Sequence, residues 1–259
     1  MNHLDKRFII LRSINFGLII FVITYLTFSF FDLAIFKFSR TLSGQLFWFF
    51  GNIVDLISDI VDPLNIALLS IFFLSMSMLV KNSLKEPNKK KLIESKFKLS
   101  SDIINETLKY YELIFQHIII SIIFSGLLCH ILKFVFGVSR PKYYFLEGYE
   151  RFDNFNLFHK INSLPSGHTQ AAFTITILFI IYVNRFVIPI ILVSILIGLS
   201  RIFLSMHFPS DIILGGYIGL IGPILTYFLI FQRKFALFNK DKILKAKVFL
   251  KILCYKFYI

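Results

Sequence analysis

The chain has 259 residues, of which 56% are hydrophobic and 17% are charged, and its formal charge is +13. An average soluble domain holds about 45–50% apolar and about 25% charged residues, so this composition is typical of a membrane protein and excludes a disordered chain. Two cysteines, Cys129 and Cys254, are too few for a disulfide scaffold. The excess of basic residues would favour nucleic-acid binding in a soluble protein. Here most of them lie between or after apolar runs, as membrane topology requires.

Six segments are apolar over about the 20 residues that a membrane-spanning helix needs. In chain order they are 14–36, 63–80, 111–137, 166–183, 186–204 and 211–231. Between the first two lies Leu42–Asp62, whose amphipathic and aromatic pattern predicts a helix at the membrane interface. The first apolar stretch is too long for a cleaved signal peptide, so we expect it to be retained. The sequence predicts an all-α, polytopic membrane bundle of about six transmembrane helices and one interfacial helix.

Basic residues are distributed unevenly between the two sides of this predicted bundle. Of the 28 Lys and Arg, 20 lie on the side that holds both termini and 6 on the opposite side. This imbalance predicts cytoplasmic termini, with the loops 37–62, 139–164 and 205–210 facing outward. Without internal repeats or low-complexity linkers, we expect residues 1–259 to form one integral-membrane domain. Its basic tail, 233–259, ends in alternating basic and apolar residues that lie on the anionic leaflet or are solvated.

Ionisable residues in or beside membrane spans indicate function, and here they form three clusters on the outward side. The first is KFVFGVSRP, Lys133–Pro141. Lys133 and Arg140 are seven residues, or about two helical turns, apart and can share one face. Two like charges on one face favour an anion between them. The alternative is a pair of side chains that snorkel to the interface.

The second cluster is LPSGHT, Leu164–Thr169, at the start of the fourth span. A helix N-terminus offers backbone N–H groups that suit a phosphate. Gly167 lets an anion approach the backbone closely, and His168 would project near it. Taken alone, such a histidine is more often structural.

The third cluster is SRIFLSMHFPSD, Ser200–Asp211. Arg201 lies in an apolar run and needs an anionic partner. Asp211 follows His207 by four residues, a spacing at which the carboxylate can fix the imidazole tautomer and leave the other ring nitrogen to attack.

Together the clusters supply three cations, a helix N-terminus and two histidines. This set suits a phosphoryl group. A zinc site could use His168, His207 and Asp211, but the nearby cations Lys133, Arg140 and Arg201 would oppose a divalent metal.

The three clusters read K-x6-R-P, P-S-G-H and S-R-x5-H-x3-D, and this pattern resembles the signature of the type 2 phosphatidic acid phosphatase (PAP2) superfamily. Every specified position between Lys133 and Asp211 matches. The superfamily includes membrane lipid phosphatases and is related to vanadium haloperoxidases. The stretch RPKYYFLEGY after the first cluster also resembles lipid A phosphatases.

The resemblance implies a role for each motif residue. His207 would be the nucleophile that forms a phosphohistidine, Asp211 would orient it, and His168 would be the general acid for the leaving group. The phosphate-binding residues would be Lys133, Arg140, Ser166, Gly167 and Arg201. The resemblance implies neither a metal nor another cofactor.

The predicted function is that of an integral-membrane lipid phosphatase, and several alternatives stay open. Lipid A 1-phosphate is the leading substrate. Undecaprenyl diphosphate, phosphatidylglycerophosphate and phosphatidic acid are alternatives, as is transfer of the phosphate to a second lipid or sugar. An anion transporter is a distant alternative, because a His–Asp pair beside a helix N-terminus is hard to explain by transport. We expect membrane lipids as partners, no nucleic acid, and a location in a bacterial inner membrane with the site facing outward.

For residues outside the motifs, the sequence leaves two interpretations open. His130 lies one turn before Lys133 and is either a neighbour of the site or a satisfied polar residue of the bundle. The loop Ser139–Leu164 carries three tyrosines and Arg151, which predicts a rim that selects substrates. An aromatic belt at the interface explains the tyrosines equally well.

Overall fold

The computed structural model describes residues 8–60, 62–156 and 158–255. Helices make up the regular structure of these residues, beside a single isolated bridge between Val138 and Phe152. The all-α prediction is confirmed. The α-helices are α2 (Ile14–Leu26), α3 (Asp32–Arg40), α4 (Gly44–Phe49), α5 (Asp55–Ile60), α6 (Pro63–Lys85), α7 (Pro87–Phe97), α8 (Ser101–Phe136), α9 (Pro141–Leu146), α10 (Gly167–Tyr182), α11 (Val187–Phe203), α12 (Pro209–Thr226), α13 (Gln232–Phe235) and α14 (Ala246–Tyr255).

Four stretches of the described chain are helical, long and apolar enough to cross a membrane: Ile14–Arg40, Gly44–Lys85 apart from residues 61 and 62, Ser101–Phe136 and Pro209–Phe235. Short π-helical turns make the first and last of them longer than a single α-helix, and in the second a π-helical turn joins α4 to α5. The remaining two predicted spans are also helical, but α10 and α11 have only 16 and 17 residues. All six predicted segments are therefore helices, and the count of six spans stays a prediction. The stretch predicted to lie at the interface is helical over 44–60, and its depth in the membrane is likewise a prediction.

The chain forms two compact units, one of residues 1–65 with 121–225 and one of residues 66–120 with 226–259. The unit boundaries fall inside α6, α8 and α12. All the motif residues, from Lys133 to Asp211, belong to the first unit. The assignment of the chain to one domain stays a prediction.

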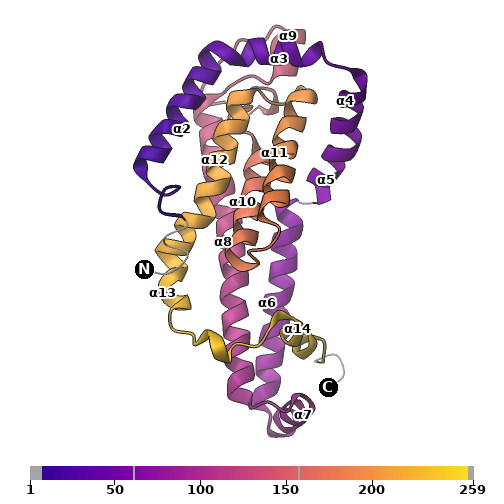
Figure 1. Cartoon of the computed structure of the whole chain (residues 1–259), viewed down its shortest axis with the longest axis vertical. Coiled ribbons are helices and arrows are strands. Elements are labelled where there is room, and N and C mark those ends of the chain that lie inside the picture. The colour runs from indigo at the N-terminus through magenta and orange to yellow at the C-terminus, as the bar shows by residue number, and fades with distance from the viewer. Residues whose placement is uncertain (1–7, 61, 157, 256–259) are drawn as a thin grey trace. The chain divides into compact units, whose positions relative to one another are not determined.

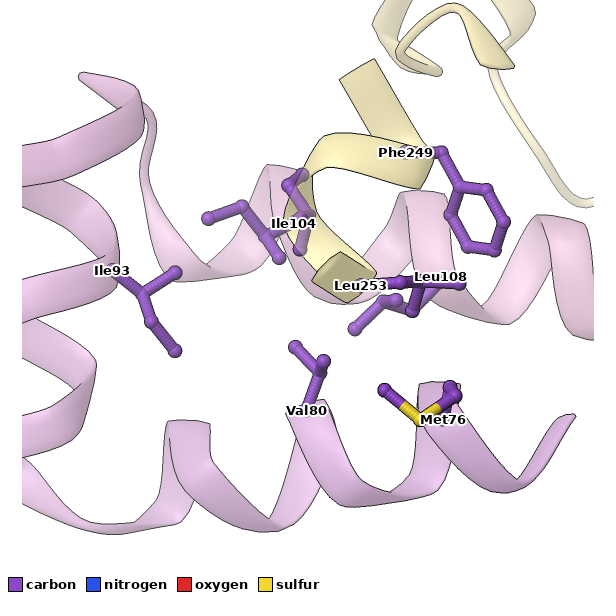
Figure 2. Packing of buried hydrophobic residues seen from close by; sticks show 8 residues of the cluster. Met76, Val80, Ile93, Ile104, Leu108, Phe249 and Leu253 are labelled. Atoms are coloured by element: carbon purple, nitrogen blue, oxygen red, sulfur yellow. The ribbon is translucent and has the colours of Figure 1, made fainter. Parts of the chain in front are cut away.

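The second unit has its own apolar core, shown in Figure 2. Met76 and Val80 of α6 and Ile104 and Leu108 of α8 pack with Phe249 and its neighbours on α14. Phe249, Ile252 and Leu253 share one face of α14 because residues three and four apart coincide on a helix, and each is at most 3% exposed. We expected the tail to be solvated or to lie on the leaflet. The structure corrects this for α14, whose apolar face is buried in protein.

In the first unit, α10, α11 and α12 carry the second and third motifs (Figure 1). Glycines bring α12 close to α10. A Cβ added to Gly215 would lie 2.4 Å from the carbonyl oxygen of Ser166, and one added to Gly219 would lie 2.3 Å from that of Gln170. This approach of the two backbones places the N-terminus of α10 beside the N-terminus of α12, where the third motif lies.

The N-terminal helices cover the same region. Arg40, the last residue of α3, donates to the carbonyl oxygens of Ile202 at 2.6 Å and Phe203 at 3.0 Å. A cation at this place satisfies the terminal carbonyls of α11 and complements its dipole. Phe36 of α3 is buried with Ile202 and Phe208, the residue next to His207. The N-terminal segment therefore fixes the loop between α11 and α12.

Candidate active site

His207 lies at the centre of the site, in the loop between α11 and α12. Its ring and the carboxylate of Asp211 are buried, with residue exposures of 2% and 0%. His207 Nδ1 is 3.4 Å from Asp211 Oδ2 and 3.3 Å from the hydroxyl of Ser163. The Ser163 hydroxyl donates to the same carboxylate oxygen at 2.5 Å, and the backbone N–H of Phe208 donates to it at 2.7 Å. The predicted pairing of His207 with Asp211 is present.

This arrangement differentiates the two ring nitrogens of His207. Both polar partners lie at Nδ1, so Nε2 is the nitrogen available to attack an electrophile. Ser163 was missed in the sequence, because it precedes the second motif and nothing in its local pattern marks it.

The two cations of the first motif meet on one residue. Lys133 Nζ donates to the backbone oxygen of Asn162 at 2.6 Å, and Arg140 Nη2 donates to the side-chain oxygen of Asn162 at 3.1 Å. Arg140 Nε also donates to the backbone oxygen of His159 at 2.9 Å. Each cation is 7% exposed. Both cations, seven residues apart in the sequence, are thus held together by Asn162 of the loop. Asn162 is a second site residue that the sequence did not predict.

Arg201 has the anionic partner that its place in an apolar run required. The partner is Asp55 of α5, which forms an ion pair with Arg201 Nη2. The Arg201 side chain is 5% exposed, whereas that of Asp55 is 34% exposed. We assigned Asp55 only to an amphipathic interfacial helix. An acidic residue in an aromatic and apolar stretch was the signal that could have linked it to the site.

The second motif begins α10. The hydroxyl of Ser166 accepts from the backbone N–H of Thr169 at 3.4 Å and from its hydroxyl at 2.9 Å, which is N-cap chemistry. The backbone N–H of Ser166 donates to the backbone oxygen of Asp211 at 2.9 Å. A Cβ on Gly167 would lie 4.0 Å from Lys133 Cε. The three motifs, up to 78 positions apart in the printed sequence, therefore meet at one place.

His168 differs from His207 in its surroundings. It is exposed and lines a cavity of about 380 Å³, whose other lining residues include Asp62, His130 and Gln170. His207 does not line this cavity. The two histidines therefore have the separate environments that a buried nucleophile and an accessible proton donor would need.

Burial and charge lower the pKa of His207 well below its ordinary value. Loss of solvent is the largest cause, followed by the positive charges of Lys133 and Arg140. The imidazole is therefore held neutral, as a nucleophile must be. Burial also lowers the pKa of Arg140, while the charge of Arg140 lowers the pKa of His159.

The protonation of His207 predicts how stability depends on pH. Because its folded pKa lies below that of an unfolded histidine, about 6.5, the unfolded chain binds more protons between the two values. The contribution of His207 to the free energy of unfolding is therefore complete above pH 6.5 and is lost as the pH falls below 6.5. Between about pH 7.5 and 5.5, we expect the thermal midpoint in detergent to fall about 2–4 °C less in His207→Gln than in the native chain. Equal declines would contradict this.

Two residues outside the motifs, Asp32 and Arg151, hold the end of the third motif in place. The carboxylate of Asp32 in α3 accepts from the backbone N–H of Ser210 at 2.9 Å and its hydroxyl at 2.6 Å. It also accepts from Arg151 Nη2 at 2.5 Å, while the Arg151 guanidinium lies 3.7 Å from the ring centre of Phe208. We predicted Arg151 as part of a substrate-selecting rim. In the structure it anchors the loop to Asp32 of α3, which in turn holds the first turn of α12, and its role in a rim stays a prediction.

The zinc alternative gains no support from the geometry. Within residues 8–60, 62–156 and 158–255, no three His, Cys, Asp or Glu side chains are grouped so that they could hold a metal ion. The cations around His207 oppose a divalent ion by their charge.

A buried His–Asp pair beside three cations and a helix N-terminus, carried by an all-α membrane bundle, defines an anion-handling site. Residues 116–235 match the PAP2 superfamily, so the resemblance seen in the three motifs is confirmed for this part of the chain.

Two curated proteins, both named lipid A 1-phosphatase, are similar to this chain. The protein from Rhizobium johnstonii is 30% identical over 130 residues, which cover 50% of this chain and 53% of the relative. The protein from Rhizobium etli is 30% identical over 106 residues, covering 41% and 46%. The chain thus spans about half the length of the curated relatives it matches.

Proposed function

We propose that the chain is a membrane phosphatase that hydrolyses a lipid phosphate through a phosphohistidine, with lipid A 1-phosphate as the leading substrate. The observation that carries the proposal is the buried His207, held by Asp211 and Ser163 at Nδ1 and surrounded by the three motif cations. The names of the two curated relatives support the substrate class.

In the first step, His207 Nε2 attacks the phosphorus atom of the substrate. The new P–N bond forms as the bond from phosphorus to the leaving oxygen breaks, and His168 donates a proton to that oxygen. Asp211 stabilises the positive charge that develops on the His207 ring. In the second step, water attacks the phosphorus, His168 accepts its proton, and the P–N bond breaks to release phosphate.

The cations lower the barrier of both steps. Lys133, Arg140 and Arg201 bind the phosphate oxygens, with Ser166 and Gly167 at the N-terminus of α10. Positioning and charge stabilisation are most of what phosphoryl transfer requires, so the proposed mechanism uses no metal and no other cofactor.

The location follows from the distribution of charge. The excess of Lys and Arg on the side of the termini supports cytoplasmic termini and an outward-facing site. The two relatives come from bacteria, which supports a bacterial inner membrane. A lipid substrate would then enter from the outer leaflet with its chains still in the bilayer.

A panel of lipids tests the proposal. The full chain, purified in detergent with EDTA, is offered lipid A 1-phosphate, undecaprenyl diphosphate, phosphatidylglycerophosphate and phosphatidic acid, and released phosphate is measured. EDTA-insensitive release from lipid A 1-phosphate supports the proposal, and preferential release from another lipid replaces the substrate. Release that EDTA abolishes would overturn the metal-free mechanism. Appearance of phosphate on an added lipid or sugar acceptor would favour transfer over hydrolysis.

The proposed role of His168 predicts a dependence on the leaving group. An alcohol leaving group needs a proton, whereas p-nitrophenolate leaves without one. We expect His168→Ala to reduce kcat for a lipid phosphate about 10²–10⁴-fold and that for p-nitrophenyl phosphate much less. Equal losses on both substrates would contradict the role of general acid. The steady-state rates of the two substrates, measured on the same preparation, decide between these outcomes.

A further inference from the structure

We infer that the cavity beside His168 is the leaving-group site, and that His130 and Asp62 there select a hydroxyl-rich, sugar-type leaving group. The inference rests on the proposed function and names the residues that would choose its substrate class. Neither residue belongs to a motif.

The position of His168 decides what the cavity would hold. A general acid must lie within hydrogen-bond reach of the oxygen it protonates. His168 is exposed and lines this cavity. His207, which would bind the phosphorus, is buried and does not line it. The phosphate would therefore lie between the two histidines, and the alcohol that leaves would extend into the cavity.

The size of the cavity suits the polar part of a substrate. Its volume of about 380 Å³ is near the lower end of the range for small-molecule sites, about 300–1,000 Å³. It would hold a sugar-sized group, but several long acyl chains would have to remain outside, in the bilayer.

The polar lining favours a leaving group that carries hydrogen-bonding groups. Asp62 precedes α6 and is an acceptor, while His130 of α8 can donate or accept. Both are exposed. Gln170 and Thr174 of α10 add further polar groups and bond to each other at 2.9 Å. A hydrocarbon leaving group would desolvate these groups without replacing their hydrogen bonds.

Apolar residues complete the cavity. Leu64, Ile122 and Ala171 line it beside the polar set. A pyranose ring presents both C–H faces and hydroxyl edges, and an N-acyl group adds an amide and the start of a chain. The lining therefore matches an acylated amino sugar better than a prenyl chain or a glycerol ester.

The test compares two variants with matched controls. His130→Ala removes the α8 group, and its control is Ile131→Ala, an exposed neighbour that does not line the cavity. Asp62→Asn keeps an oxygen for the bond from the backbone N–H of Leu64, and its control is the exposed Asp153→Asn, which lies outside the cavity and keeps an oxygen for the bond from Asn156. Each variant is assayed with an N-acylglucosamine 1-phosphate lipid, a phosphatidic acid of equal chain length and p-nitrophenyl phosphate.

We expect His130→Ala and Asp62→Asn each to raise KM for the sugar lipid about tenfold, with kcat/KM for the other two substrates changed less than twofold. The control variants should leave all three substrates unchanged. Equal losses on all three substrates, or no loss on the sugar lipid, would overturn the assignment of the cavity.

A binding measurement separates this inference from the proposed hydrolysis. The probe is an alkyl N-acylglucosamine without phosphate, titrated into the detergent-solubilised chain, with a monoacylglycerol of equal length as comparison. Binding of the sugar probe that His130→Ala weakens supports the cavity assignment even if the chain hydrolyses nothing. Equal binding of both probes, or binding that His130→Ala does not change, would overturn it.

Discussion

Replacing His207 with alanine is expected to abolish phosphate release, with kcat falling by about 10⁴-fold or more. The ring would supply both the nucleophile and the covalent intermediate, and water at the same place has neither the geometry nor the basicity to substitute for it. The remaining cations would still bind phosphate, so affinity for inorganic phosphate should change far less than the rate.

A trapping experiment checks the intermediate directly. The native chain is mixed with a ³²P-labelled lipid phosphate and quenched in alkali, which preserves a phosphoramidate bond. Label should remain on the native chain and be absent from His207→Ala. His159→Ala is the control, because the hydrogen bond from Arg140 is to the backbone oxygen of His159 and is kept when the side chain is removed. Persisting turnover in His207→Ala would remove His207 as the nucleophile, and label on His207→Ala would assign the intermediate to another residue.

Replacing Asp32 with alanine is expected to destabilise the first unit by about 3–5 kcal/mol, the usual effect of removing one partner from a buried ion pair. The Asp32 side chain is fully buried and that of Arg151 is 16% exposed. The substitution would leave the guanidinium without its carboxylate and deprive Ser210 of an acceptor for two hydrogen bonds. Since Ser210 lies in the first turn of α12 next to Asp211, activity should fall together with stability.

The thermal midpoint and kcat/KM of the detergent-solubilised chain measure this effect. Asp59→Ala serves as the control, because Asp59 is an exposed acid of the same N-terminal region. The double variant Asp32→Ala/Arg151→Met should regain part of the lost stability, because it no longer buries an uncompensated charge. A midpoint for Asp32→Ala equal to that of the native chain would show that the ion pair does not hold α12.

The composition class, the positions of the helices and the chemistry of the motif residues could be predicted from the sequence alone. Long apolar runs can satisfy their backbone groups in a bilayer only as helices or closed barrels, so their positions could be predicted. His207 and Asp211 are only four residues apart, so their pairing could be predicted locally, even though His207 lies in the loop before α12 and not on the helix with Asp211. The roles of the other motif residues were predicted from the resemblance to the PAP2 superfamily.

Only the tertiary structure identified the residues that hold this chemistry in place. Asp32 binds Ser210 across 178 positions, Asp55 pairs with Arg201 across 146, and Ser163 reaches Asp211 across 48. Such partners are brought together by helix packing, which in α12 depends on glycines that allow close backbone contact. Periodicity records which face of a helix is apolar, but not which distant residue will lie against it, so these contacts had no local signal from which they could be predicted.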